Sequence, residues 1–123
     1  MPIINIKTLL KSIRYASRGI GKTWRNEQNF KIDVIAALIV VIFMIYFRIN
    51  WGEIIVLTLM IILVMVLELI NTAVEKMIDI VNPRLHDYAE AVKDILAGAV
   101  LIASIGALFV GVLIFYPYIT GQK

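Results

Sequence analysis

Three long stretches of the chain carry almost no charge, and this feature restricts the possible fold more than any other. They cover about residues 32–49, 53–70 and 95–118. As helices, these stretches are long enough to cross the roughly 30 Å hydrocarbon core of a bilayer. Hydrophobic residues make up 61% of the sequence and the mean hydropathy is +0.90, well above the roughly 45–50% apolar content of soluble domains. The 123 residues therefore predict an all-α membrane protein with three transmembrane helices in a single domain.

The segment before the first apolar stretch, at about residues 5–25, has two stripes at helical spacing. One stripe is apolar and the other is basic. The apolar residues are Ile6, Leu10, Ile13, Ile20 and Trp24, and the basic residues are Lys7, Lys11, Arg14, Arg18, Lys22 and Arg25. This pattern predicts an amphipathic surface helix that lies in the membrane interface with its basic side toward anionic headgroups.

The basic residues also predict the orientation of the chain. Ten of the 12 Lys and Arg residues lie before the first span or between the second and third spans. By the positive-inside rule, the N-terminus is then cytoplasmic and the C-terminus lies outside. We attribute the net charge of +3 to this distribution and expect no nucleic acid partner. The chain has no cysteine, which excludes disulfides, thiolate metal sites and thiol nucleophiles.

Carboxylates and amides form a stripe where the second apolar stretch continues to about residue 81. Glu68, Asn71, Glu75, Asp79 and Asn82 are spaced by 3, 4, 4 and 3 residues, which places them on one helix face. Glu68 lies 15 residues after Glu53, or about 22 Å along a helix, which is close to the cytoplasmic interface. A buried acid in a span is costly and usually faces a partner or a site. Pro83 ends this helix.

Other polar residues reach the same membrane depth from two further directions. Asn26 and Glu27 precede the first span, and Lys93 and Asp94 end a polar link, at 84–94, that leads into the third span. Carboxylates from two helices suit Mg²⁺, and a lysine suits the phosphate oxygens that Mg²⁺ accompanies. We therefore expect a site at this layer, although ordinary solvated helix ends would explain Asp79 equally well. His86, the one histidine of the sequence, lies in the same link.

Residues 16–23 read ASRGIGKT and match the loose form of a phosphate-binding loop. That loop requires a preceding strand and a soluble α/β sheet, and neither can be built from this sequence. We interpret the segment as part of the surface helix.

Two other functions fit some of these features. A small ion-coupled transporter would line its path with the acidic stripe, but residues 54–67 contain no ionisable group and Thr58 is their one polar side chain. A non-catalytic membrane assembly subunit would leave the acidic residues of this stripe unexplained.

The sequence resembles the small bacterial membrane lipid kinases, the family that includes diacylglycerol kinase and undecaprenol kinase. Three segments carry the resemblance: WRNEQNFK at 24–31, ELINTAVEKMID at 68–79 and HDYAEAVKDILAGAV at 86–100. The order and separation of these segments also match the family. The resemblance covers nearly the whole chain and implies a homotrimer in the bacterial inner membrane with sites shared between protomers.

The resemblance also implies roles for individual residues. Glu68 is expected to be the catalytic base for a lipid hydroxyl, with Asn71 beside the reacting groups, and Glu27 and Glu75 are expected to bind Mg²⁺ with ATP. The other nucleotide-binding positions implied are Tyr15, Arg84, His86, Lys93 and Asp94. The positions implied at the lipid alcohol are Trp24, Asn26, Glu68 and Ala97.

Three departures from the diacylglycerol kinase pattern bear on the lipid substrate. Arg25 replaces an apolar residue, Asp33 replaces a glutamate, and Ala97 and Gly98 replace a glycine-serine pair. The sequence of the third segment, at 86–100, is more similar to the Gram-positive branch of the family. The resemblance therefore favours undecaprenol over diacylglycerol as the lipid alcohol.

Overall fold

The computed structural model describes residues 3–81 and 86–123. Within these residues the chain forms four helices and no strand: α1 (Ile6–Asn26), α2 (Gln28–Phe47), α3 (Trp51–Val81) and α4 (His86–Ile119). Helices α2, α3 and α4 are long and apolar enough to cross a membrane. The all-helical fold with three candidate spans is therefore confirmed.

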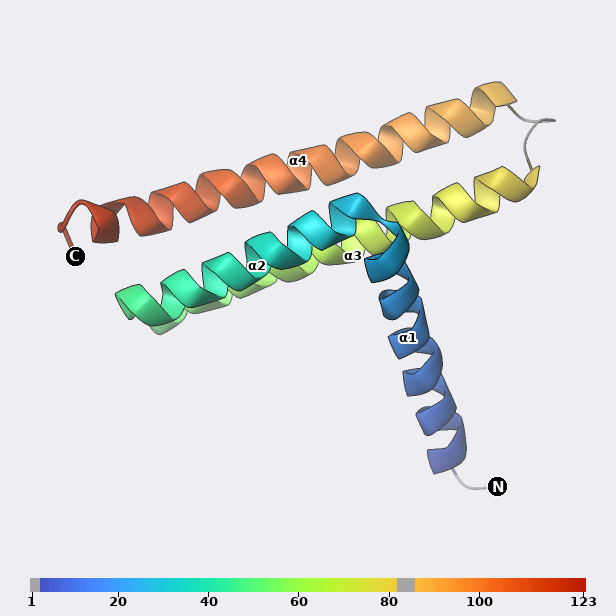
Figure 1. Cartoon of the computed structure of the whole chain (residues 1–123), viewed down its shortest axis with the longest axis horizontal. Coiled ribbons are helices and arrows are strands. Elements are labelled where there is room, and N and C mark those ends of the chain that lie inside the picture. The colour runs from blue at the N-terminus through green and yellow to red at the C-terminus, as the bar shows by residue number, and fades with distance from the viewer. Residues whose placement is uncertain (1–2, 82–85) are drawn as a thin grey trace.

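Helix α3 is the central element of the bundle (Figure 1). Both α4 and α2 pack along it, and α1 contacts α2 and α3 at one place. Away from that junction, α1 projects sideways from the other three helices, and α3 and α4 continue together beyond the start of α2 (Figure 1). The polar half of α3 is thus flanked by the α1–α2 junction on one side and by α4 on another.

The junction between α1 and α2 is a single extended residue. Glu27 has φ −112° and ψ 113°, and its N–H donates to the carbonyl of Thr23 at 2.9 Å. Thr23 is buried and its hydroxyl donates to the carbonyl of Gly19 at 2.9 Å. Phe30, one turn into α2, is 2% exposed. These contacts fix the position at which Glu27 leaves α1. The ASRGIGKT segment, residues 16–23, lies wholly inside α1, so it forms no phosphate-binding loop.

The turn from α2 to α3, together with the C-terminus, forms what we call the capped end. Arg48 ends α2 in a left-handed conformation with φ 50°. Asn50 and Glu53 then form a capping box, in which Glu53 N–H donates to Asn50 Oδ1 at 2.9 Å and Asn50 N–H donates to Glu53 Oε1 at 3.3 Å. Glu53 also accepts hydrogen bonds from the Tyr118 hydroxyl and from Lys123 Nζ. This carboxylate therefore joins α3 to the end of α4.

The apolar core lies next to the capped end. Met44, Ile49, Leu57 and Phe115 form its buried cluster. Ile49 N–H donates to the Met44 carbonyl at 3.4 Å, so the residue after the left-handed Arg48 packs back on the end of α2, as in a Schellman motif. Most other apolar side chains of the three long helices are exposed on this single chain. Lipid or further protein chains must cover them.

Helix α4 begins well before the expected third span and ends close to the predicted residue 118. The polar link predicted at 84–94 is helical from His86, because Ala89, Glu90, Ala91 and Lys93 favour helix and Asp87 suits its first turn. The helix also continues past Pro117 to Ile119. Near a helix end a proline removes only one hydrogen bond, and Gly121, at φ 76°, completes the C-cap with a bond from Gln122 N–H to the Pro117 carbonyl at 2.8 Å.

Candidate active site

The acidic stripe of α3 lies on the face that the neighbouring helices cover. Glu68 is 3% exposed, and Thr72, one turn further, is buried and donates its hydroxyl to the Glu68 carbonyl at 3.0 Å. Asn71 and Glu75 are half-buried, and Asn71 Nδ2 donates to Glu75 Oε1 at 3.3 Å. The helical spacing predicted from the sequence therefore does place Glu68, Asn71 and Glu75 together.

Two further carboxylates approach this stripe from other elements. Glu27 comes from the α1–α2 junction and Asp33 from the second turn of α2. Both lie close enough to act electrostatically on Glu68, as does Glu75. Four acidic groups so close together repel one another, and a bound cation would relieve that repulsion. The convergence of Glu27 with Glu68 and Glu75 agrees with the sequence prediction, whereas Asp33 is an addition to it.

Two oxygen atoms at this place are buried without a hydrogen-bond partner in the described structure. They are Asn71 Oδ1 and Asp33 Oδ2. Buried polar atoms are normally paired, so atoms left unpaired usually indicate a missing ligand or water. The described residues include no group of three or more Asp, Glu or His side chains arranged to hold a metal ion by themselves. A metal here would need oxygen ligands from a substrate or water as well.

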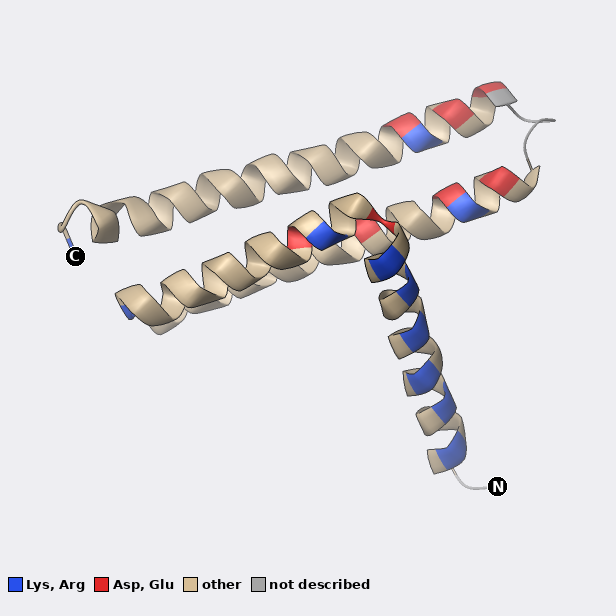
Figure 2. Cartoon of the chain, in the orientation of Figure 1, with Lys and Arg blue, Asp and Glu red and all other residues tan. Residues whose placement is uncertain are grey.

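The ends of α3 and α4 that lie away from the capped end carry further charges (Figure 2). Lys93 on α4 reaches across to α3, with its Nζ 3.4 Å from Asp79 Oδ1. Asp94 is exposed beside it. We call this region, together with Glu27, Glu68 and Glu75, the charged end of the bundle. Lys93, predicted to contact nucleotide, is paired with Asp79 in this structure.

The remaining predicted site residues are more scattered. Tyr15 is exposed half-way along α1, where the Arg18 guanidinium carbon lies 5.9 Å from its ring centroid. Trp24 is 39% exposed and Asn26 ends α1, while Ala97 is exposed on α4. Arg84 lies outside the described residues, and the backbone of His86 begins α4. In the single chain, Tyr15 therefore lies away from the acidic group.

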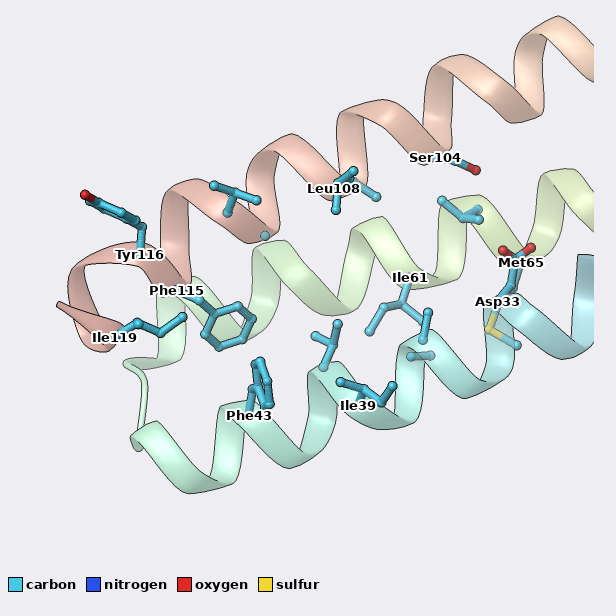
Figure 3. A pocket seen from close by; sticks show the side chains of 17 residues that line it. Asp33, Ile39, Phe43, Ile61, Met65, Ser104, Leu108, Phe115, Tyr116 and Ile119 are labelled. Atoms are coloured by element: carbon cyan, nitrogen blue, oxygen red, sulfur yellow. The ribbon is translucent and has the colours of Figure 1, made fainter.

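A groove of about 450 Å³ runs between α2, α3 and α4, and the sequence did not predict it. Asp33 lies at one end, and Tyr116 and Ile119 lie near the other (Figure 3). The walls between them are apolar except for Ser104. The small residues Ala36, Ala37, Ala107 and Gly111 line the groove and make room for it. Its Asp33 end points toward the acidic group around Glu68.

The model of the prokaryotic diacylglycerol kinase family matches residues 14–115 of the chain, which is most of its length and includes the whole charged end. This chain belongs to that family. An undecaprenol kinase of Bacillus subtilis is 36% identical over 112 residues, covering 91% of each chain. A diacylglycerol kinase of Synechocystis is 37% identical over 110 residues, covering 89% of this chain and 63% of that protein. The diacylglycerol kinase of Escherichia coli K12 is 26% identical over 110 residues, covering 89% and 90%.

Membership of the prokaryotic diacylglycerol kinase family makes the chain an enzyme, a phosphotransferase with an alcohol group as acceptor. Family membership and the three candidate transmembrane helices together support a multi-pass membrane protein of lipid metabolism. The resemblance identified from the sequence segments is confirmed. The roles of individual residues remain predictions.

Proposed function

We propose that this protein is an ATP-dependent lipid kinase that phosphorylates undecaprenol in preference to diacylglycerol. The observation that carries the proposal is the buried Glu68 carboxylate, within electrostatic reach of Glu27, Glu75 and Asp33, at the polar end of a candidate transmembrane helix. At such a position a water-soluble nucleotide could meet a lipid headgroup without either molecule crossing the bilayer.

Glu68 serves as the general base in this proposal. It is buried at the apolar end of the acidic stripe and would accept the proton of the primary hydroxyl as that oxygen attacks the γ-phosphorus of ATP and ADP leaves with the bridging oxygen. A positioned base of this kind typically contributes about 10²–10⁴-fold to the rate. Asn71, one turn away, has a buried oxygen without a partner and would orient the reacting groups.

Glu27 and Glu75 are the residues that would hold Mg²⁺. Two carboxylates from separate elements, with the unpartnered Asn71 Oδ1 nearby, fit an ion that takes one or two protein carboxylates and completes its shell with waters and phosphate oxygens. When bound, Mg²⁺ would neutralise negative charge on the phosphates of ATP. The protein groups themselves repel one another until a cation is present.

The nucleotide would lie over the charged end. Lys93 offers an ammonium to phosphate oxygens, as general phosphoryl-transfer chemistry requires, and Asp94, Tyr15, Arg84 and His86 are further nucleotide positions by resemblance. Tyr15 is exposed half-way along α1, away from the acidic group of this chain, so we propose that it completes a site on a neighbouring protomer. A homotrimer with shared sites would accommodate this and would cover part of the exposed apolar surface.

The groove between α2, α3 and α4 would hold the hydrocarbon chain of the lipid alcohol. It is apolar along its length and ends at Asp33, which lies near Glu68. A chain in this groove would present its hydroxyl to the proposed base, with Trp24, Asn26 and Ala97 as further lipid positions by resemblance. We favour undecaprenol because the similar Bacillus subtilis protein is an undecaprenol kinase. The similarity covers 91% of both chains.

We further propose that the charged end faces the cytoplasm of a bacterial cell and that α1 lies on the surface of the inner membrane. Lys and Arg follow the length of α1 (Figure 2), as expected of a helix beside anionic headgroups.

The direct test is transfer of radiolabelled γ-phosphate from ATP to undecaprenol and to diacylglycerol by purified protein, in parallel and with Mg²⁺ present. Label should appear in both lipids, with the higher kcat/KM for undecaprenol. A higher kcat/KM for diacylglycerol would reverse the substrate assignment. Label in neither lipid would contradict the kinase proposal and favour a transporter or an assembly subunit.

A further inference from the structure

The ion pair between Asp79 and Lys93 connects the charged ends of α3 and α4. Lys93 Nζ lies 3.4 Å from Asp79 Oδ1, and the two side chains are 37% and 68% exposed respectively. Ion pairs this exposed contribute little to stability because water and salt screen them. The pair is therefore a poor structural clamp, and its ammonium can exchange readily to another anion.

This ion pair lies close to the proposed metal site. Asp79 is four residues after Glu75 on the same face of α3, which corresponds to about 6 Å along the helix. The four-carbon stem of a lysine can cover such a distance by a change of rotamer. Phosphates bound beside Glu75 would therefore lie within reach of the ammonium that Asp79 holds in this structure.

We propose that Asp79 is a positioning residue that holds the Lys93 ammonium when nucleotide phosphates are absent and competes with them for it. This inference rests on the proposed function, because it assumes a nucleoside triphosphate beside Glu75. Asp79 weakens the binding of ATP and ADP in two ways. It occupies a cation that they need, and its own negative charge repels their phosphates. The enzyme gains faster release of the nucleoside diphosphate product.

Two constants test this role. They are KM for ATP in lipid phosphorylation and the dissociation constant of MgADP at equilibrium. Asp79→Asn should lower both by about two- to fivefold, with kcat for the chemical step unchanged. At 1.4 kcal/mol per tenfold this corresponds to about 0.4–1 kcal/mol, the range of an exposed ion pair. In a Lys93→Met background the same substitution should change the dissociation constant of MgADP by much less, because the ammonium for which Asp79 and the phosphates compete is gone.

Controls separate this role from a structural one. Asp87→Asn makes the same change of charge on the first turn of α4 and should leave both constants unchanged, and Asp79→Ser should repeat the effect of Asp79→Asn. Asp79 variants that are folded but bind MgADP equally or more weakly would overturn the inference while leaving the proposed function intact. A folded wild type that phosphorylates no lipid alcohol would overturn both.

Discussion

The side-chain amide of Asn71 donates a hydrogen bond to Glu75, with 3.3 Å between Nδ2 and Oε1. The two residues are one helical turn apart on α3, and Asn71 Oδ1 is buried without a partner. Asn71 therefore orients the Glu75 carboxylate with its nitrogen and leaves its oxygen for a substrate, a water or a metal.

This relationship predicts that Asn71→Ala alters the metal requirement of the enzyme. Loss of a partner that orients a metal ligand typically weakens metal binding by about 10–100-fold. We expect the Mg²⁺ concentration for half-maximal activity to rise by about tenfold or more at saturating ATP. Asn50→Ala, the same substitution at the capped end, should leave that concentration unchanged, and equal Mg²⁺ midpoints for both variants would contradict the role given to Asn71.

Glu27 and Glu75 should behave as one unit if they share a Mg²⁺ ion. Glu27→Gln and Glu75→Gln should each raise the Mg²⁺ midpoint, and the double variant should lose much less activity than the product of the single losses, because the shared ion is already disturbed. A Mg²⁺ titration of the four proteins measures this. If the losses of activity of the two single variants simply multiply in the double variant, and their Mg²⁺ midpoints are unchanged, Glu27 and Glu75 do not share a metal ion.

The groove predicts a variant that affects the lipid and not the nucleotide. A Cβ at Gly111 would meet nothing within 4 Å, so Gly111→Leu should fold while its side chain fills part of the groove. We expect KM for the lipid alcohol to rise several-fold with KM for ATP unchanged. Thr58→Leu adds bulk at an exposed position of α3 outside the groove and should change neither constant. If Gly111→Leu also behaves like wild type, the groove does not bind the lipid.

Most of the fold could be predicted from the sequence, because helices that cross a membrane must be long and apolar. The start of α4 was predicted less well. Residues 86–94 were expected to form a polar link but are helical, since polarity there results from Asp, Glu and Lys on a segment that also contains good helix formers. The other end of α4, at Ile119, lies close to the predicted residue 118.

The stripe from Glu68 to Asp79 could be predicted because the spacing of residues within one helix fixes the face on which they lie. Contacts between helices could not be predicted in the same way. The approach of Asp33 to Glu68, the pairing of Lys93 with Asp79 and the groove all depend on how α2 and α4 are placed against α3. Tyr15 is a different case, since its exposed position half-way along α1 does not by itself explain the nucleotide-binding role predicted for it.

The capped end predicts a loss of stability without a loss of chemistry. Asn50→Ala removes the side-chain acceptor of the Glu53 N–H, and such N-cap losses typically cost about 0.5–2 kcal/mol. Denaturant titration in detergent should show a free energy of unfolding lower by that amount, with KM values for ATP and lipid close to wild type. Asn29→Ala, which removes an exposed amide from α2, serves as the matched control. A stability equal to that of the control would contradict the capping box.

If Glu68 takes the proton of the lipid hydroxyl, as proposed, phosphoryl transfer should be lost in Glu68→Gln. The substitution keeps the size of the buried side chain and removes its ability to act as a base. With radiolabelled ATP and undecaprenol, we expect kcat to fall by about 10²–10⁴-fold, while MgADP binding and the unfolding transition stay close to wild type. Glu53→Gln, the same chemical change at the capped end, should retain its turnover. A folded Glu68→Gln protein that phosphorylates the lipid at a near-wild-type rate would contradict the account.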